Sequence, residues 1–380
     1  MTLVGDACEA GSQKPRGPER LLPPPGRIVR DPVMAEERIG SMTHVSAPRV
    51  PCDTLCHKRT SWVESGRRRP EGGGRKEGKD VPELPDVTVY VERVRALAGG
   101  QALRHLRVHT PFLLRSVDPE PSAFAGRPLL DARRLGKRIV LAFSGEHFMV
   151  LHLMIAGRLH WRAPDAVLAG KMSLAALDFP AGSLVLTEAG SKRRASLHLV
   201  RGAAGLAAFA REGVDVFSAT PGGFAAALRR HNRTLKRALT DPDVIDGVGN
   251  AYSDEILHRA RLSPLRQTGA MSDEEVERLL TSARQVLEEW VERLRAQAGD
   301  GFLDKVTAFH KEMAVHGKFG EPCPVCGAPV QRIKYADNEA NYCPACQTEG
   351  RLLADRGLSR LLKEDWPRTL LELEERRGPR

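Results

Sequence analysis

Apolar residues begin to recur at a regular period near residue 84 of the 380-residue chain. From Leu84 to Ala98 they fall at the spacing of one face of a helix. Pro85 suits a first helical turn, and the two glycines at positions 99 and 100 suit a helix end. We therefore predict a helix over residues 84–98.

Short apolar runs separated by turn residues follow, as far as about residue 201. Several of them alternate apolar and polar positions with the two-residue period of β-strands. They cover residues 105–109, 138–143, 148–154, 157–162, 174–179, 182–189 and 195–200. Closely spaced strands of this kind predict an antiparallel β-sandwich.

The period becomes helical again from about residue 204. We predict helices over Gly222–Arg230, Arg233–Leu239, Ala251–Ala260 and Asp273–Gln297. The last of these begins with Ser272 and Glu275, which are spaced as a capping box.

A Gly-x-Gly turn lies between the second and third of these helices, over residues 246–250. The backbone amides at such a helix start favour a phosphate. The same pattern also occurs in turns that bind nothing, so both interpretations stay open.

Four cysteines near the C-terminus have metal-binding spacing: Cys323 and Cys326, then Cys343 and Cys346. Four thiolates suit a tetrahedral structural zinc and leave no open position for catalysis. The alternative is four free buried cysteines. Residues 330–342, between the two pairs, predict a hairpin whose tip faces a ligand.

These patterns together predict an α+β protein with several parts. Residues 82–203 form a helix plus antiparallel sandwich, residues 204–312 a helical domain, and residues 313–349 a four-cysteine finger. Residues 350–380 form a charged helical appendix, whose partial apolar stripe consists of Trp366, Leu370, Leu371 and Leu373.

Residues 1–80 are rich in Pro, Gly and Arg and have little apolar period. That composition predicts a disordered leader, or translated sequence upstream of the true start; loose binding of nucleic acid is a further interpretation. The leader holds the other cysteines, Cys8, Cys52 and Cys56. With His57 the last two make only a weak metal candidate, because no second pair is near.

A net charge of +10 favours a polyanionic partner. No apolar run approaches the ~18 residues of a membrane span, and no secretory signal is present. We therefore expect a reducing, cytoplasmic location, in which disulfides are not expected.

Three segments occur in an order that resembles the formamidopyrimidine-DNA glycosylase / endonuclease VIII family. They are PELPDV at residues 82–87, IDGVGNAYSDEIL at residues 245–257, and the four-cysteine segment. The resemblance covers roughly residues 82–349. It implies a helix–two-turn–helix domain and a zinc finger beside the sandwich. It also implies a bacterial, nucleoid-associated monomer that binds double-stranded DNA with damaged bases or abasic sites.

The activity that the resemblance implies is that of a bifunctional DNA glycosylase and AP lyase of base excision repair. A flipped-out nucleotide would be attacked at C1′ by the amine of Pro82, which displaces the oxidised base and leaves an iminium for β-elimination. Glu83 would protonate the sugar ring oxygen or the leaving base. Lys137 would contact phosphate and assist catalysis, and Lys236 and Asn250 would hold backbone phosphates.

The chain departs from the family pattern at three places. Asn338 replaces an arginine that assists δ-elimination, so that second step stays open. Ile155, with Met154 beside it, takes the place of a methionine that fills the gap left by the flipped base. Lys192 or Arg193 would supply the charge of a second wedge segment. Preference for oxidised purines or pyrimidines therefore stays open.

Val81 acylates Pro82 in the chain as written, and an amide nitrogen cannot form an iminium. In one interpretation residue 81 is a bacterial start codon read as methionine, whose removal exposes Pro82. In another, the full chain binds DNA lesions without cleaving DNA. A third class, an RNA-binding or transcription-related zinc-ribbon protein, gives the PELP segment no role.

Overall fold

Helix α1 spans Leu84–Ala98, the residues over which the sequence predicts it. It is part of a computed structural model that describes residues 82–189, 193–303, 310–335, 339–354 and 367–377. The helix begins at a capping box in which the Glu83 amide donates to the Asp86 carboxylate at 2.9 Å. The apolar residues that predicted this helix, among them Val87, Val91 and Val94, lie on its buried face.

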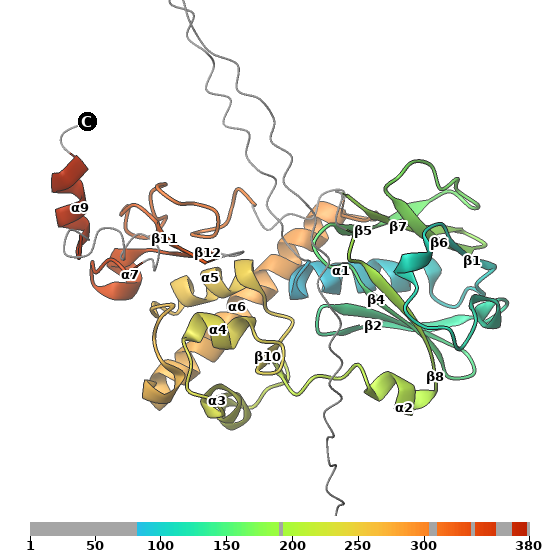
Figure 1. The fold of residues 1–380 in the computed structure, drawn as a ribbon, viewed down its shortest axis with the longest axis horizontal. Helices are drawn as coiled ribbons and strands as arrows, with labels where there is room; N and C mark the ends of the chain where they lie inside the picture. Colours follow the sequence, from blue (N-terminus) through green and yellow to red (C-terminus); the bar gives the residue numbers. More distant parts are fainter. Residues whose placement is uncertain (1–81, 190–192, 304–309, 336–338, 355–366, 378–380) are drawn as a thin grey trace, which may run out of the picture. The chain divides into compact units, whose positions relative to one another are not determined.

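Two four-stranded antiparallel sheets follow α1 and confirm the predicted sandwich (Figure 1). One has the order β1-β6-β7-β5, with β1 at His105–Val108, β6 at Ser173–Phe179, β7 at Gly182–Glu188 and β5 at Gly157–Arg162. The other has the order β2-β3-β4-β8, with β2 at Leu129–Leu135, β3 at Arg138–Phe143, β4 at His147–His152 and β8 at Ser196–Arg201. Two 3-10 turns lie between β1 and β2, at Pro111–Leu113 and Pro121–Phe124.

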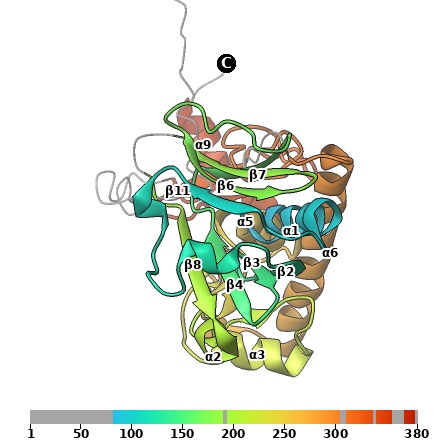
Figure 2. The same cartoon turned by 90° about the vertical axis from the view of Figure 1, so that its right-hand side faces the viewer.

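The core of the sandwich lies between the two sheets, whose layers are visible in Figure 2. Strand register places Leu141, Met149 and Leu199 opposite one another on the inner face of the second sheet. Their neighbours Val140 and Val150 point the other way, into a smaller apolar cluster. Alternate residues of these strands therefore face opposite sides of the sheet, and both sides are apolar here.

The helical part contains α2 at Gly202–Ala207, α3 at Pro221–Arg229, α4 at Leu235–Thr240, α5 at Asn250–Arg259 and α6 at Asp273–Ala298. A short parallel ladder joins β9, Val214–Asp215, to β10, Ile245–Asp246, and a 3-10 turn spans Thr268–Ala270. The four predicted helices are confirmed to within two residues at each end. The Ser272–Glu275 capping box is also present.

Two helices are shared between the sandwich core and the helical core. Leu84, the first residue of α1, is buried among the helical residues, whereas Val87, one turn later, is buried in the sandwich. Helix α6 contributes Trp290 to the helical core and Leu294 and Ala298 to the sandwich core. The start of α1 is therefore fixed from both sides.

The C-terminal part contains the predicted hairpin, with β11 at Gln331–Lys334 and β12 at Glu339–Tyr342. Helix α7 at Pro344–Thr348 follows it, and α9 at Leu370–Arg377 lies in the predicted helical appendix. The predictions for residues 1–81, Lys192, Asn338 and Trp366 lie outside the described residues. Among the helices described, none has the length and apolar content needed to cross a bilayer.

Candidate active site and metal centre

The Glu83 side chain is 3% exposed and lies against the first turn of α5. Its carboxylate accepts hydrogen bonds from three backbone amides: Gly249 at 2.6 Å, Ala251 at 2.9 Å and Tyr252 at 3.4 Å. The next residue, Leu84, donates its amide to the carbonyl of Gly247 at 2.9 Å. The PELPDV segment is therefore anchored on the turn that precedes α5.

The sequence left open whether the amides at this turn bind a phosphate. In the structure the amides of Gly249 and of two residues in the first turn of α5 donate to the Glu83 carboxylate. The positive end of a helix and its unpaired amides stabilise a carboxylate as well as a phosphate. Here the carboxylate of Glu83 accepts from the amide of Gly249, the residue before the helix. We call the amides of residues 249, 251 and 252 the Glu83 cradle.

Lys137 lies on the turn between β2 and β3 and reaches the same place. A Cβ added to Gly249 would overlap both the Lys137 Nζ and the Glu83 carboxyl group. A Cβ added to Gly136, which has φ +61°, would overlap the Asp246 carboxyl. The turn that contains Gly136 and the turn that contains Gly249 therefore pack closely against each other. This packing places the Lys137 ammonium next to the Glu83 carboxyl group.

The surroundings of Lys137 are basic. Burial, then the charges of Arg138 and Lys137, lower the pKa of His152 to about 4. The ring of His152 is thus neutral at pH 7, and the positive charge comes from the lysine and the arginine. Such a surface favours an anion.

Asp86 is a buried acid next to Glu83. The pKa of Asp86 is raised to about 7, mainly by burial and also by the negative charge of Glu83, which together outweigh the hydrogen bond from the Glu83 amide and the charge of Arg158. Asp86 therefore exchanges its proton near neutral pH, the range suited to acid–base work. Sequence analysis did not single it out, although its spacing of three residues from Glu83 is that of a capping box.

Lys236 is buried rather than exposed: 6% of the residue is accessible. Its ammonium donates to the carbonyl of Asn250 and to the Asp254 carboxylate, both at 2.6 Å. Asn250 itself is the first residue of α5 and is half-buried. Lys236 thus stabilises the N-terminal half of α5 through internal hydrogen bonds. One of them is to Asn250, the other residue that was expected to contact phosphate.

Ile155 and Arg193 lie on neighbouring loops of the sandwich. Ile155 is in the turn between β4 and β5. The amide of Ala189, the residue after β7, donates to the carbonyl of Ala156 at 3.3 Å, so the end of β7 lies beside this turn. Both residues are partly exposed. Arg158, in β5 directly after this turn, donates to the carbonyl of Ile155 at 3.3 Å, and its charge lowers the pKa of Asp86. The loop of Ile155 therefore borders the Glu83 region.

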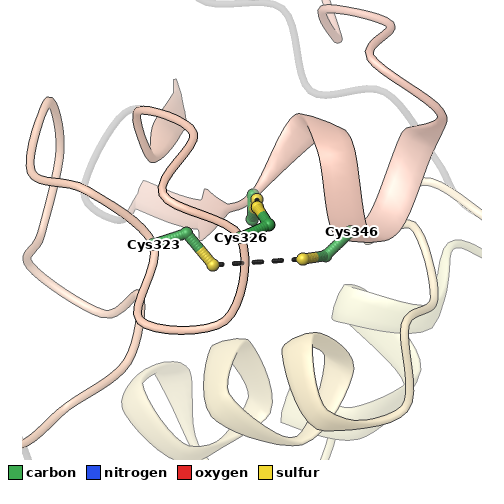
Figure 3. Close-up of side chains that lie close together, drawn as sticks. Cys323, Cys326 and Cys346 are labelled. Carbon is green, nitrogen blue, oxygen red and sulfur yellow. Dashed lines mark hydrogen bonds between the residues drawn. The ribbon is translucent and has the colours of Figure 1, made fainter.

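The four cysteines gather at one point of the C-terminal finger, as Figure 3 shows for Cys323, Cys326 and Cys346. Their sulfurs all lie within 4.8 Å of one another, with 3.4 Å from Cys326 to Cys343 and 3.9 Å from Cys323 to Cys346. A tetrahedral zinc with Zn–S distances of about 2.3 Å has its sulfurs roughly 3.8 Å apart. The donor set and its spacing therefore fit such an ion.

Helix α5 also holds the finger, through residues that the sequence did not reveal as functional. The Glu255 carboxylate accepts from the amides of Ala314, Val315 and His316 at 2.8 to 2.9 Å. Asp254 accepts from the Asn341 amide at 3.1 Å and lies 2.8 Å from Nδ1 of His316. Asp254 and Glu255 lie in the middle of α5. In the sequence they cannot be told from acidic residues on the solvent-exposed face of a helix, so the pattern alone did not indicate their role.

The network around Asp254 favours its charged form. Burial alone raises the pKa of Asp254, but the Lys236 charge and the His316 hydrogen bond outweigh burial, and the pKa is lowered overall. Asp254 thus remains ionised at neutral pH, and it joins α4, α5 and the finger.

Three family models match the chain in the order of these parts. The formamidopyrimidine-DNA glycosylase N-terminal domain matches residues 81–193, the formamidopyrimidine-DNA glycosylase H2TH domain residues 215–299, and the zinc finger found in FPG and IleRS residues 320–348. The predicted helix–two-turn–helix domain and cysteine finger are thereby confirmed.

Curated relatives extend over the same region. A formamidopyrimidine-DNA glycosylase of Thermus thermophilus is 35% identical over 280 residues, which cover 71% of this chain and 100% of the relative. One of Exiguobacterium is 30% identical and covers 70% and 99%. An uncharacterized formamidopyrimidine-DNA glycosylase-like protein of Mycobacterium tuberculosis is 40% identical over 151 residues, 40% of this chain and 94% of that protein. The chain belongs to the formamidopyrimidine-DNA glycosylase family.

Solved structures agree on the fold. A complex between the Lactococcus lactis Fpg and abasic-site DNA matches with a TM-score of 0.63 and 22% identity, covering 70% of this chain and 99% of that one. A structure of MutM in complex with DNA containing carbocyclic 8-oxo-G matches with the same TM-score, also at 22% identity, and covers 70% of this chain and 100% of that one.

Proposed function

We propose that this protein is a bifunctional DNA glycosylase and AP lyase of base excision repair that removes oxidised bases from double-stranded DNA. The observation that carries the proposal is the seating of Glu83 in the amides before α5, with Lys137 beside it and Pro82 next to it in the chain. This arrangement assembles an acid, a cation and the required nucleophile at one point. Family membership and the DNA complexes of the structural neighbours support it.

The proposed reaction starts at Pro82. Its amine nitrogen forms a bond to C1′ as the bond from C1′ to the base breaks, and the base leaves with the electron pair of that bond. The nitrogen then loses its proton and forms a double bond to C1′ as the bond from C1′ to the ring oxygen breaks, which opens the sugar and gives an iminium. Glu83 delivers a proton to the ring oxygen or the departing base. The resulting iminium withdraws electrons from C2′, so a proton is lost there and the 3′-phosphate leaves in a β-elimination. Lys137 stabilises negative charge near this point, because its ammonium lies against Gly249.

This chemistry requires a free amine at Pro82. We propose that the active form of the protein begins at Pro82, so that no residue acylates its nitrogen. Two comparisons support this: the N-terminal family model starts at residue 81, and 71% of this chain accounts for the whole length of the Thermus relative.

DNA binding would come from residues around the Glu83 cradle. Asn250, at the start of α5, and Lys137 would contact phosphates flanking a flipped nucleotide. Ile155 and Arg193, on adjacent loops, would fill the gap in the duplex and hold the opposite strand. Lys236 would act on phosphate through Asn250, whose carbonyl accepts a hydrogen bond from its ammonium.

The four cysteines would hold a structural zinc ion, which when bound supplies four thiolate–metal bonds and no open position for substrate. The matched zinc-finger model and the sulfur spacing support this assignment. We further propose that the protein acts as a monomer in the bacterial cytoplasm, where it associates with the nucleoid.

Borohydride trapping on an abasic duplex tests the proposal most directly. A chain begun at Pro82 should form a covalent adduct with DNA, whereas the chain that keeps Val81 should form none. Glu83→Gln in the chain begun at Pro82 should abolish excision of an oxidised base. Its affinity for the same duplex, measured in parallel, reports whether the variant still folds.

Two outcomes would count against the enzyme. Failure of the Pro82-initiated chain to trap DNA, with binding intact, would favour the alternative of a non-catalytic lesion-binding protein of the same fold. N-terminal sequencing of the protein made from its own gene gives the second test, because a mature chain that retains Val81 cannot use Pro82 as a nucleophile.

A further inference from the structure

His258 lies at the C-terminal end of α5 and contacts the metal centre. Its Nε2 is 3.3 Å from Sγ of Cys323, and both residues are buried, with 6% and 3% of their surfaces accessible. A thiolate bound to a metal carries no proton, so this contact is a hydrogen bond only when Nε2 is the donor. The geometry therefore implies an N–H···S bond from the helix to the finger.

Negative charge explains why such a donor matters. Four thiolates around a divalent ion leave an excess negative charge, and a partly buried site must stabilise it with hydrogen-bond donors. Cys326 receives a backbone hydrogen bond from Ala328, and Cys343 receives one from Cys346. Both of these donors belong to the finger itself, whereas the donor to Cys323 is a side chain from another part of the fold.

The same helix connects this donor to the candidate active site. The N-terminal turn of α5 provides the Glu83 cradle, and the middle of the helix binds the finger through Asp254 and Glu255. His258 occupies the last turn. Helix α5 is thus a single rigid element with the catalytic acid at one end and a metal ligand at the other.

We propose that His258 is a positioning residue of the metal centre, whose Nε2–H donates to the Cys323 thiolate and so fastens α5 to the metal-loaded finger. This inference rests on the metal proposed above for the four cysteines. Hydrogen-bonding partners of metal ligands typically contribute 10- to 100-fold to metal affinity. The loss of this donor should therefore weaken the metal site without removing any ligand.

Zinc release from the loaded full chain to a chromogenic chelator measures this contribution. His258→Phe keeps an aromatic ring but has no donor, and it should release zinc about 10- to 100-fold faster than the unmodified chain. His258→Gln retains an N–H at similar reach and should restore most of the retention. Arg259→Gln is the matched control, because Arg259 is adjacent on α5 and pairs with Glu289 rather than with a cysteine.

A second measurement needs no substitution. In the full chain loaded with ¹¹³Cd²⁺, the Nε2 proton of His258 should be slow to exchange and should show a scalar coupling to the metal through the sulfur. Equal release rates for His258→Phe and Arg259→Gln would overturn the inference, and so would the absence of that proton signal. If the chain instead binds less than one equivalent of zinc, the proposed metal itself fails, which is a distinct result.

Discussion

The Glu83 carboxylate accepts a hydrogen bond of 2.6 Å from the amide of Gly249, a residue 166 positions later in the chain. The bond is possible because Gly249 has no side chain: a Cβ there would overlap the Glu83 carboxyl and the Lys137 ammonium. The backbone of Gly249 is extended, with φ −130°, so the restriction is one of space and not of backbone conformation. Glycine at this position thus sets the distance between the acid and the helix.

Gly249→Ala should therefore impair catalysis far more than folding. A displacement of Glu83 by about 1 Å can cost on the order of 100-fold in rate, and we expect a loss of that size in adduct formation by the chain begun at Pro82. Gly222→Ala is the control, because a Cβ at Gly222, in the first turn of α3, meets nothing within 4 Å. A Gly249→Ala variant as active as Gly222→Ala would show that Glu83 is not required in this position.

Lys236→Met should destabilise the fold. It leaves the carboxylate of Asp254, which is fully buried, without its cation, and breaking a buried ion pair in this way costs about 3–5 kcal/mol. Urea unfolding would measure the change. The double variant Lys236→Met/Asp254→Asn should lose less than the sum of the single variants, because it removes both charges together.

The Lys236→Met variant also distinguishes a direct contact between Lys236 and DNA phosphate from a purely internal, stabilising role. A direct phosphate contact would make the salt dependence of DNA binding shallower by roughly one unit of log–log slope. A purely internal role leaves that slope unchanged and lowers only the stability. We expect the slope to stay nearly unchanged, since the ammonium already donates to Asn250 and Asp254.

The titration of Asp86 predicts a pH-dependent term in stability. Its pKa in the folded chain is about 7, above the usual value of 3.8, so the folded state binds more protons between these two values. The free energy of unfolding should therefore fall, through this group, as the pH rises from about 4 to about 7, by at most about 4 kcal/mol.

Asp86→Asn isolates that term, because it removes the proton and keeps an acceptor for the Glu83 amide. Relative to the unmodified chain, the variant should gain stability between pH 4.5 and pH 8, as measured by chemical denaturation. Asp273→Asn serves as the control, since the Asp273 side chain is 87% exposed. A parallel pH dependence in all three proteins would contradict the assignment.

Asn338 stands where the family pattern has an arginine, so we predict that strand cleavage stops after β-elimination. Gel analysis should then show mainly the 3′-unsaturated aldehyde. Asn338→Arg should increase the δ-elimination product about tenfold or more, the contribution of one hydrogen bond to a charged group. A 3′-phosphate as the main product of the unmodified chain would show that another residue assists this step.

Elements with a clear local signal were predictable from the sequence. The boundaries of α1 follow from Pro85 at its first turn and from the glycines after Ala98, and the start of α6 follows from its capping box. The cysteine spacing likewise specified the finger, since two pairs at this separation have few other uses.

Strand β2 shows where the local signal failed. Its residues Leu129, Ala132 and Leu135 recur every third position. The register shifts between Leu129 and Asp131, so Leu129 and Ala132 both face the sandwich core, whereas Leu135 packs against the smaller apolar cluster on the other face. A bulge of this kind breaks the two-residue period by which strands are recognised. Of the two arginines between Ala132 and Leu135, Arg133 is exposed, whereas Arg134 is mostly buried and pairs with Asp215.

The contacts of the candidate site were less predictable, because they join residues distant in sequence. Nothing near residue 249 indicates that its amide binds Glu83, and nothing near residue 236 indicates that its lysine is buried. His258 lies among charged and apolar helical residues and has no motif of its own. Local sequence patterns predict which segments form helices. The contacts at the two ends of α5, to Glu83 and to Cys323, depend on tertiary packing and are not visible in those patterns.

The sharing of α1 and α6 between two cores has a consequence for how the protein comes apart. Leu84 is buried with the helices and Val87 with the sheets, and α6 contributes Trp290 to one core and Leu294 to the other. Neither half can melt without exposing apolar surface of the other, so calorimetry should record one cooperative transition for both. A fragment that ends near residue 203 would lack the amides that hold Glu83 and part of the sandwich core, so we expect that it would not fold on its own.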